Sequence, residues 1–253
     1  MKKIILFLIA IILIAPLLHA QDNTTMNNTM VYQLNHKNLV KLNLFALALK
    51  NITVQYEREI SKKTTVGLTL RVMPNSGLPF KSSFRNAMND STAQKQIDNF
   101  KTGNFAIMPE IRFYLGHKGA YHGFYIASFF SYAHYTGDLP YSYYDNGTEK
   151  IIPLSGSINT ITGGLMFGAQ WNLAKAVYLD WWIMGPHYGS SDGRISGKKS
   201  LSSTEQSALK SDLDNLNIPL VKTTNTVDAN GATINFSGPW AGIRSGLCIG
   251  FRF

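Results

Sequence analysis

The sequence of 253 residues has little cysteine and little charge. Its one cysteine, Cys248, excludes an intramolecular disulfide framework and any zinc cluster built from several cysteines. Charged residues make up 15% of the chain and hydrophobic residues 45%. The charged fraction lies below the ~25% of ordinary soluble domains. Low charge together with this hydrophobic content excludes a disordered chain.

The start of the chain has the pattern of a secretory signal peptide. Two lysines precede an apolar run that ends at Leu18, and the small residue Ala20 stands before a polar stretch. We therefore expect residues 1–20 to be removed on export. A retained helical anchor is the alternative, because the run is nearly long enough to span a bilayer. Residues 21–38 are expected to form a flexible periplasmic segment, and residues 39–253 the folded domain.

From Leu39 onward, apolar residues recur with a period of two, which is typical of β-strands. Val66, Leu68 and Leu70, for example, alternate with threonine and glycine. No later run approaches the ~20 apolar residues of a membrane-spanning helix. The alternation predicts eight strands, near residues 39–49, 52–57, 65–72, 105–115, 121–135, 158–171, 177–184 and 242–253.

The links between these strands alternate in length as well. Short links at 61–63, 116–120 and 172–175 are separated by long links at 73–103, 136–157 and 186–239, although the first link is also short. Tight turns at one end and long loops at the other are typical of outer-membrane barrels. The prediction is an all-β, transmembrane, eight-stranded antiparallel up-and-down β-barrel with long extracellular loops. A soluble β-sandwich, with its charged face outward, is the alternative.

The charged residues of the predicted strands share one face, and the opposite face is nearly free of charge. In a barrel that spans lipid, the charged face must line the lumen. Eight strands enclose just enough room for side chains, so we expect a closed lumen held by paired charges, with an ion channel as the alternative. The predicted lumen network is Lys41, Glu57, Glu59, Arg71, Glu110, Arg112, Asp180, Arg244 and Arg252.

The end of the chain resembles the insertion signal that the barrel-assembly machinery reads. Leu247, Ile249, Phe251 and the terminal Phe253 alternate along one face. With the segments PEIRFYL, GFYI and DWWIMGPHYG, this ending makes the chain similar to a family of small, largely uncharacterised eight-stranded outer-membrane proteins of Gram-negative bacteria. The resemblance covers about residues 39–253. It implies an outer-membrane location, with membrane lipids and the assembly machinery as partners.

The predicted function is structural or surface-binding, without enzymatic activity or a cofactor. The loops are the expected place for an extracellular or surface partner. The alternative is a rim hydrolase or acyltransferase acting on envelope lipid, with His187, Ser190 and Asp192 as catalytic candidates. These residues also suit a turn where a strand leaves the membrane. The histidines have no metal-ligand spacing, so no metal is expected.

The net charge of +9 does not indicate a nucleic-acid partner. The three long links hold ten basic and ten acidic residues, whereas three short links hold four lysines and no acid. Such lysines suit the anionic headgroups at a periplasmic rim. A nucleic-acid site would need a basic patch interleaved with aromatic residues, and no link has one.

The longest link is predicted to contain a short helix over Ser203–Asn217. Ser203 and Gln206 fit a capping box, and Leu209, Leu213 and Leu216 recur on one helical face. We expect the helix to fold its loop over the barrel mouth, with a partner-binding surface as the alternative.

Overall fold

The structure, a computed structural model, describes residues 36–86, 91–145, 147–214 and 220–253. The predicted signal peptide, and the expected N-terminal segment up to Asn35, lie outside these residues. The unit from His36 to Phe253 is therefore described by itself.

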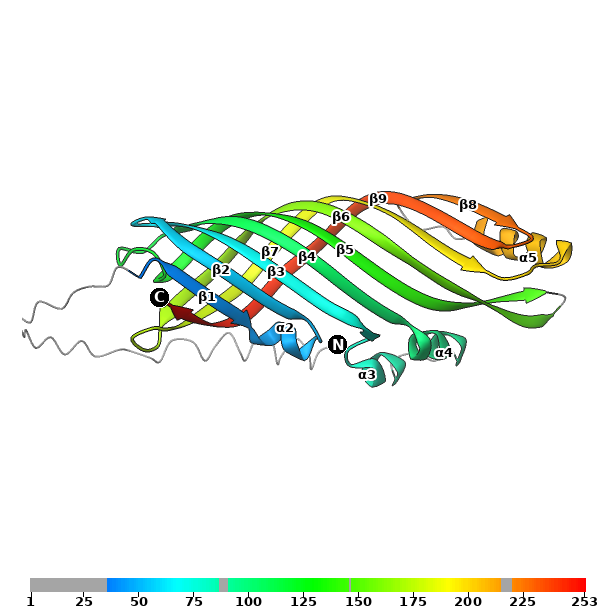
Figure 1. Ribbon diagram of the computed structural model, residues 1–253, viewed down its shortest axis with the longest axis horizontal. Helices are drawn as coiled ribbons and strands as arrows, with labels where there is room; N and C mark the ends of the chain where they lie inside the picture. The colour runs from blue at the N-terminus through cyan, green and yellow to red at the C-terminus, as the bar shows by residue number, and fades with distance from the viewer. Residues whose placement is uncertain (1–35, 87–90, 146, 215–219) are drawn as a thin grey trace, which may run out of the picture. The chain divides into compact units, whose positions relative to one another are not determined.

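Nine strands form one antiparallel sheet in the order β1-β2-β3-β4-β5-β6-β7-β9-β8, and β1 also pairs with β9 (Figure 1). That last pairing closes a ring of eight strands, while β8 lies beside β9 as an additional strand. The predicted eight-stranded up-and-down barrel is therefore confirmed. The strands are β1 Asn38–Asn43, β2 Ile52–Ser61, β3 Thr64–Gly77, β4 Lys101–Tyr114, β5 Gly123–Asp145, β6 Thr148–Asn172, β7 Val177–Lys198, β8 Lys222–Asp228 and β9 Gly231–Arg252.

Four short helices accompany the sheet in the described part of the chain. None of them is long and apolar enough to cross a bilayer. They are α2 Leu44–Ala48, α3 Lys81–Asn86, α4 Ser91–Asn99 and α5 Ser203–Asp214.

The first strand is shorter than predicted. The prediction of a strand up to Leu49 is wrong, because β1 ends at Asn43 and α2 begins at the next residue. The Asn43 side chain accepts a hydrogen bond of 3.0 Å from the backbone N–H of Ala46. An N-cap of this kind favours a helical turn over continued extension.

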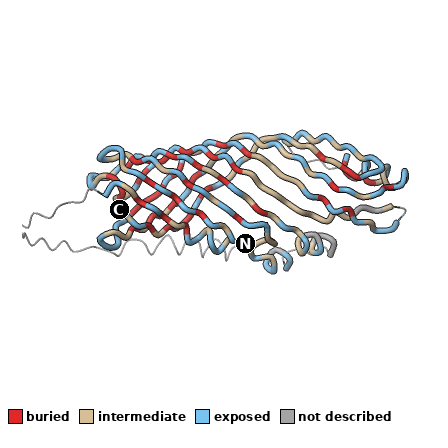
Figure 2. The backbone as a smooth tube through the Cα atoms, viewed as in Figure 1, coloured by how far each residue is buried: buried red, intermediate tan, exposed pale blue. Residues whose placement is uncertain are grey.

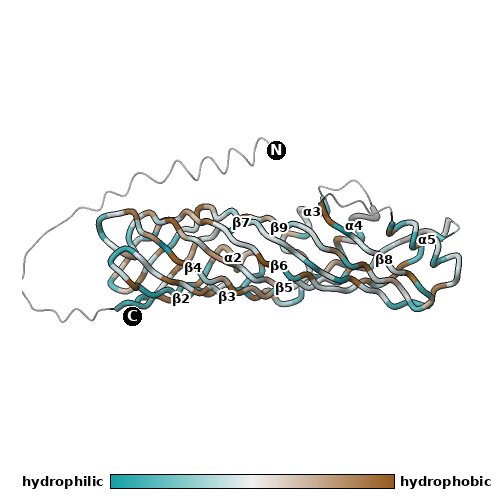
Figure 3. Tube along the Cα trace, turned by 90° about the horizontal axis from the view of Figure 1, so that it is seen from above, coloured by the Kyte–Doolittle hydropathy of each residue, from teal (hydrophilic) through white to brown (hydrophobic). Residues whose placement is uncertain are grey.

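The alternation of residues along the strands separates an outer from an inner face. On β3, Val66, Leu68 and Leu70 are exposed, whereas Thr65 and Thr69 on the alternate positions are buried. Figure 2 shows this alternation along the ring strands, and Figure 3 shows that hydrophobic residues recur along the same strands. The segment 121–135 has apolar residues at both parities, and the structure turns its odd-numbered residues inward from Tyr125 to Ala133. The ring thus has an apolar exterior and an interior that combines charged and polar side chains with buried aromatic ones.

The predicted short links lie together at one end of the ring. The backbone N–H of Ala120 donates to Lys62 at 2.7 Å, and that of Arg252 donates to Ala176 at 2.8 Å. These contacts join the turns to each other and to the C-terminal end of β9. The strands therefore run up and down, with these three short links at the end that carries Phe253.

Two of the predicted long links are largely strand, which corrects the sequence prediction. β5 and β6 pair continuously up to Asp145 and Thr148, and β7 and β9 pair up to Lys198 and Gly231. These segments are rich in glycine, serine and proline, which are typical of loops. The backbone ladder continues nonetheless, because cross-strand hydrogen bonds need no apolar face. The sheet consequently extends well beyond the closed ring.

The predicted helix in the longest link is confirmed over Ser203–Asp214, and residues 215–219 lie outside the described chain. Its cap differs from the prediction by one residue. The Ser202 Oγ accepts from the Glu205 N–H at 3.3 Å, and the Glu205 carboxylate accepts from the Ser202 N–H at 2.9 Å. Glutamate at the third helical position forms this reciprocal pair. The helix packs on the extended sheet through a small core of Leu201, Leu209, Leu213, Ile152, Leu154, Ala232 and Ile234.

Candidate functional site

Six charged side chains meet inside the ring. Each is on the inward parity of its strand, and none is more than 9% exposed. They come from five different strands, so the closed sheet rather than any local segment brings them together. The six residues are Lys41 on β1, Glu57 on β2, Glu110 and Arg112 on β4, Asp180 on β7 and Arg244 on β9.

The six side chains form one connected set of ion pairs. Lys41 Nζ contacts Asp180 at 2.5 Å and also pairs with Glu57. The Arg112 guanidinium contacts Asp180 at 2.7 Å, Glu57 at 3.4 Å and Glu110. Arg244 contacts Glu110 at 2.6 Å. Three cations thus balance three carboxylates, and the buried set is neutral.

Neutral neighbours supply the remaining hydrogen bonds of this network. Gln55 accepts from Arg112 at 2.8 Å, and Thr65 donates to Glu57 at 2.5 Å. Tyr125 and Trp182 both donate to Asp180, at 2.8 and 2.9 Å. Buried charges are tolerated when their lone pairs and protons are satisfied in this way. The charge pattern of the sequence does not identify these neutral residues, and their inward parity is the one signal that could have.

The other three predicted network residues lie apart from the six. Glu59 and Arg252 form their own pair at 3.3 Å near the short links, with both side chains 23% exposed. Arg71 has no carboxylate within ion-pair distance among the described residues. Its Nε donates to Asn104 and its Nη2 to Tyr135, each at 2.9 Å. Arg71 is therefore a lumen cation without a counter-charge among the residues that the structure describes.

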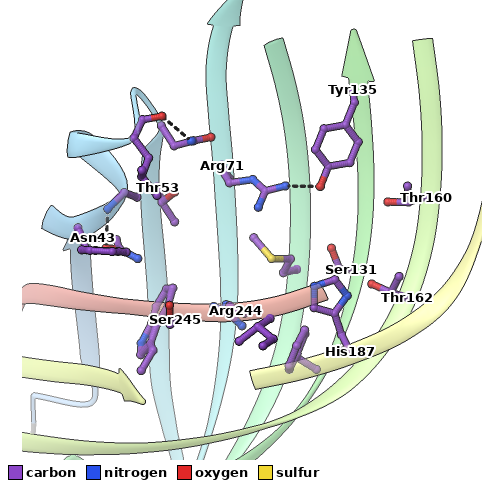
Figure 4. Close-up of a pocket in the computed structure, with 18 of the residues that line it drawn as sticks. Asn43, Thr53, Arg71, Ser131, Tyr135, Thr160, Thr162, His187, Arg244 and Ser245 are labelled. Atoms are coloured by element: carbon purple, nitrogen blue, oxygen red, sulfur yellow. Dashed lines mark hydrogen bonds between the residues drawn. The ribbon is translucent and has the colours of Figure 1, made fainter. Parts of the chain in front are cut away.

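A cavity of about 190 Å³ lies beside the network, in the half of the ring away from the short links (Figure 4). Arg71, Arg244 and His187 line it, together with hydroxyl and amide side chains such as Thr53 and Asn51. No carboxylate is among its described lining residues. Its apolar part is mainly aromatic, with Phe129, Tyr135, Trp182 and Trp240.

Three buried polar atoms of the cavity lining have no hydrogen-bond partner among the described residues. They are Thr53 Oγ1, His187 Nδ1 and Arg244 Nε. Thr53 is 3% exposed and Arg244 is 9% exposed, so bulk water does not solvate them freely. Buried polar groups are rarely left unpaired in folded proteins. Arg244 Nε and the Thr53 hydroxyl can each donate to an acceptor in the cavity, and His187 Nδ1 can do so when it carries the ring proton.

The three catalytic candidates are not brought together. A bulge between Trp182 and Gly185 shifts the register of β7 against β9, and Met184 turns outward instead of into the lumen. Beyond the bulge His187 lies on the inward face, whereas Ser190 and Asp192 lie on the outward face. The His187 ring packs edge-on against Phe129, with centroids 6.0 Å apart. Strand alternation therefore separates the candidate base from the candidate nucleophile.

The residues of the predicted assembly signal share the outer face of β9. Leu247, Phe251 and Phe253 are exposed and Ile249 is partly buried, while Cys248 between them is buried. Phe253 also closes the ring, because its N–H donates to Asn38 at 2.9 Å and its carbonyl accepts from Asn38 at 3.1 Å. Recognition by the assembly machinery stays a prediction.

Comparison with known proteins adds little to this description. No family model matches the chain, and no curated protein matches it. Among solved structures, the translocator domain of the autotransporter NalP from Neisseria meningitidis is similar over 85% of this chain and 87% of that one. The identity is 12% and the TM-score 0.28, a likeness too weak to support a conclusion about function. The resemblance to the family of small barrels stays a prediction.

Proposed function

We propose that this chain is an outer-membrane β-barrel of a Gram-negative bacterium, with a lumen blocked by paired charges. The observation that carries the proposal is the division of the ring into an apolar exterior and a neutral, ion-paired interior. On a water-soluble monomer an apolar belt of this extent would promote aggregation. In a bilayer it faces acyl chains, and the strand pairing that closes the ring satisfies most of the backbone in hydrocarbon.

The proposed orientation places the short links in the periplasm and the extended sheet outside the cell. This arrangement suits an exported barrel, whose periplasmic turns are short. Lys62, Lys63, Lys118 and Lys175 then lie near the anionic headgroups of the inner leaflet. Outer-membrane lipids are the proposed partners of the apolar belt, and the assembly machinery is the proposed partner of the last strand during insertion.

The proposed role is structural or binding, without enzymatic activity and without a nucleic-acid partner. The extended β5–β6 and β7–β9 ladders, stiffened by the α5 core, form a platform for an external partner. The alternative of a rim hydrolase gains no support, because His187 lies on the opposite face of β7 from Ser190 and Asp192. A nucleophile needs its base within hydrogen-bond reach.

Conductance measurements on the purified full-length barrel test the blocked lumen. In planar bilayers we expect no stable, porin-sized steps, because the six buried side chains fill the narrow bore of an eight-stranded ring. A porin reconstituted in the same bilayers is the positive control. Reproducible large steps from folded, heat-modifiable protein would show that the lumen conducts and that the proposal is wrong.

A further inference from the structure

We propose that the lumen cavity binds the carboxylate of an amphipathic lipid, a long-chain fatty acid, whose apolar chain leaves through a gap in the barrel wall between α2 and β9. The carboxylate site rests on the cavity itself. The lateral route for the acyl chain rests on the proposed function, because it requires the ring to be embedded in a bilayer.

The polar lining of the cavity lacks an anion. Arg71 has hydrogen bonds to Asn104 and Tyr135 and no carboxylate partner among the described residues. Arg244 already bonds Glu110 and Thr69 through its Nη atoms, and its buried Nε has no partner. With Thr53 Oγ1 and His187 Nδ1 also unpartnered, the cavity offers donors from several sides. Arginine pairs strongly with carboxylates and phosphates.

The size and lining of the cavity favour a carboxylate that carries an apolar group. Its volume of about 190 Å³ is comparable to that of an engineered cavity of ~150 Å³ that binds benzene. A carboxylate with a few methylene groups fits such a volume. Phe129, Trp182 and Trp240 provide the apolar wall. The lining thus matches a carboxylate head group followed by a short stretch of acyl chain.

The barrel wall is incomplete beside this cavity. On the edge of β9 that faces β1, the last five paired residues are Cys248–Arg252, and β8 pairs with Gly231–Ser237. Within the described chain, residues 238–247 between them have no strand neighbour on that edge. An unpaired edge at membrane depth is tolerated where protein covers it or where it lines a cavity. The end of β1 at Asn43 therefore creates a gap that α2 covers in part.

The cavity extends into this gap. Its lining includes Ile243 and Ser245, which are on the outward parity of β9, and Phe45 of α2. Ile243 is 70% exposed and Phe45 54% exposed, so the lining continues from the buried arginine to the apolar outer surface. Figure 4 shows Ser245 and Asn43 on one side of the cavity and Tyr135 on the other. An acyl chain anchored at the arginines has an apolar path into the surrounding lipid.

A fluorescent long-chain fatty acid tests the proposal with the full-length barrel in lipid nanodiscs. We expect saturable binding that the unlabelled acid competes away and that a fatty alcohol of equal length does not. Arg71→Ala should weaken binding by about tenfold or more, the scale of one lost charge-assisted hydrogen bond. Arg194→Ala is the matched control, because Arg194 lies on β7 outside this cavity and bonds Asn235. The control should bind like the wild type.

A second variant distinguishes a membrane lipid from a small soluble molecule as the source of the carboxylate. Ser245→Trp should obstruct the gap, abolishing fatty-acid binding while a small soluble carboxylate such as benzoate still binds. If benzoate binds the wild type and the fatty acid does not, the lipid assignment is wrong. If neither binds, or if Arg71→Ala binds like the wild type, the site is wrong. Heat-modifiability shows whether the barrel of each sample is folded, and conductance shows whether its lumen is blocked. A folded, non-conducting barrel that binds no fatty acid would therefore contradict this inference and leave the proposed function unaffected.

Discussion

At the scale of single residues, the lumen combines matched charges with a core of buried aromatic and apolar side chains. Arg244 has a single carboxylate partner, Glu110, whereas Arg112 has three. Both guanidinium groups also lie over aromatic rings, Arg244 at 4.1 Å from the Trp182 ring and Arg112 at 4.3 Å from the Tyr125 ring. Removal of one carboxylate should therefore affect Arg244 most.

We expect Glu110→Ala to lower the free energy of unfolding by about 3–5 kcal/mol, because it leaves Arg244 buried without a counter-charge. Urea unfolding followed by tryptophan fluorescence measures this, with Trp182 as a nearby reporter. Asp98→Ala is the control, since Asp98 pairs with Lys81 at 3.2 Å in a partly exposed site. Its loss should cost less than ~1 kcal/mol. Equal effects of the two substitutions would contradict a structural role for the buried network.

At the scale of strands, the close approach of β5, β6 and β7 depends on glycine. A Cβ at Gly164 would collide with the carbonyl oxygen of Pro186 and lie 2.8 Å from Phe129 Cζ. A Cβ at the neighbouring Gly163 would meet nothing nearer than 3.9 Å. The two positions are adjacent in sequence but face opposite sides of the sheet.

We expect Gly164→Ala to destabilise the barrel by about 1–3 kcal/mol through overpacking. Gly163→Ala, which points outward, should leave stability unchanged within about 0.5 kcal/mol. The temperature at which the folded band disappears in a heat-modifiability gel compares the two variants. The expectation fails if both alanines have the same effect.

The cap of α5 makes that helix sensitive to acid. The hydrogen bond from the Ser202 backbone N–H holds the pKa of the Glu205 carboxyl below its usual range. A lowered pKa in the folded state means that the cap stabilises the helix above the usual glutamate pKa of about 4.3. The contribution is lost as the pH falls through the lower, folded value.

Hydrogen exchange of α5 as a function of pH tests this cap. We expect protection of the helix, corrected for intrinsic exchange rates, to fall as Glu205 becomes protonated. Glu205→Gln should remove that step, because glutamine does not titrate. Protection that falls identically in both proteins would assign the acid sensitivity to another group.

At the scale of the whole molecule, the two ends of the ring differ in construction. One end has tight turns and the chain terminus, and the other has the extended sheet, the described helices α3, α4 and α5, and strand β8. Under the proposed orientation these ends lie on opposite sides of the outer membrane. Because Cys248 is buried, neither end of the ring has an accessible native thiol in the described chain.

Cysteine labelling of intact cells tests the orientation. A membrane-impermeant maleimide should label Ala229→Cys, in the exposed turn between β8 and β9, and should not label Lys118→Cys, in a short link. Permeabilised cells, in which both cysteines should react, are the control. Labelling of Lys118→Cys alone in intact cells would reverse the topology.

Properties that depend on local spacing could be predicted from the sequence. The period of two in the apolar residues identified the ring strands. The restriction of charge to one face of each strand identified Lys41, Glu57 and Glu110 as inward residues. The lengths of the links grouped the three short links at one end. Each of these follows from the geometry of a single strand or turn. The length of β5–β7 beyond the ring could not be predicted in this way, because backbone pairing there continues through residues typical of loops.

The tertiary structure decided which groups meet. Strand register places Asp180 beside Lys41 and Arg112, and leaves Arg71 without a carboxylate partner in the described part of the chain. A bulge on β7 turns His187 into the lumen and Met184 out of it. The early end of β1 opens the wall beside the cavity. The sequence by itself determined which face each side chain of a regular strand occupies, since alternation is local. Its partners depend on strand register, bulges and closure, which only the folded ring defines.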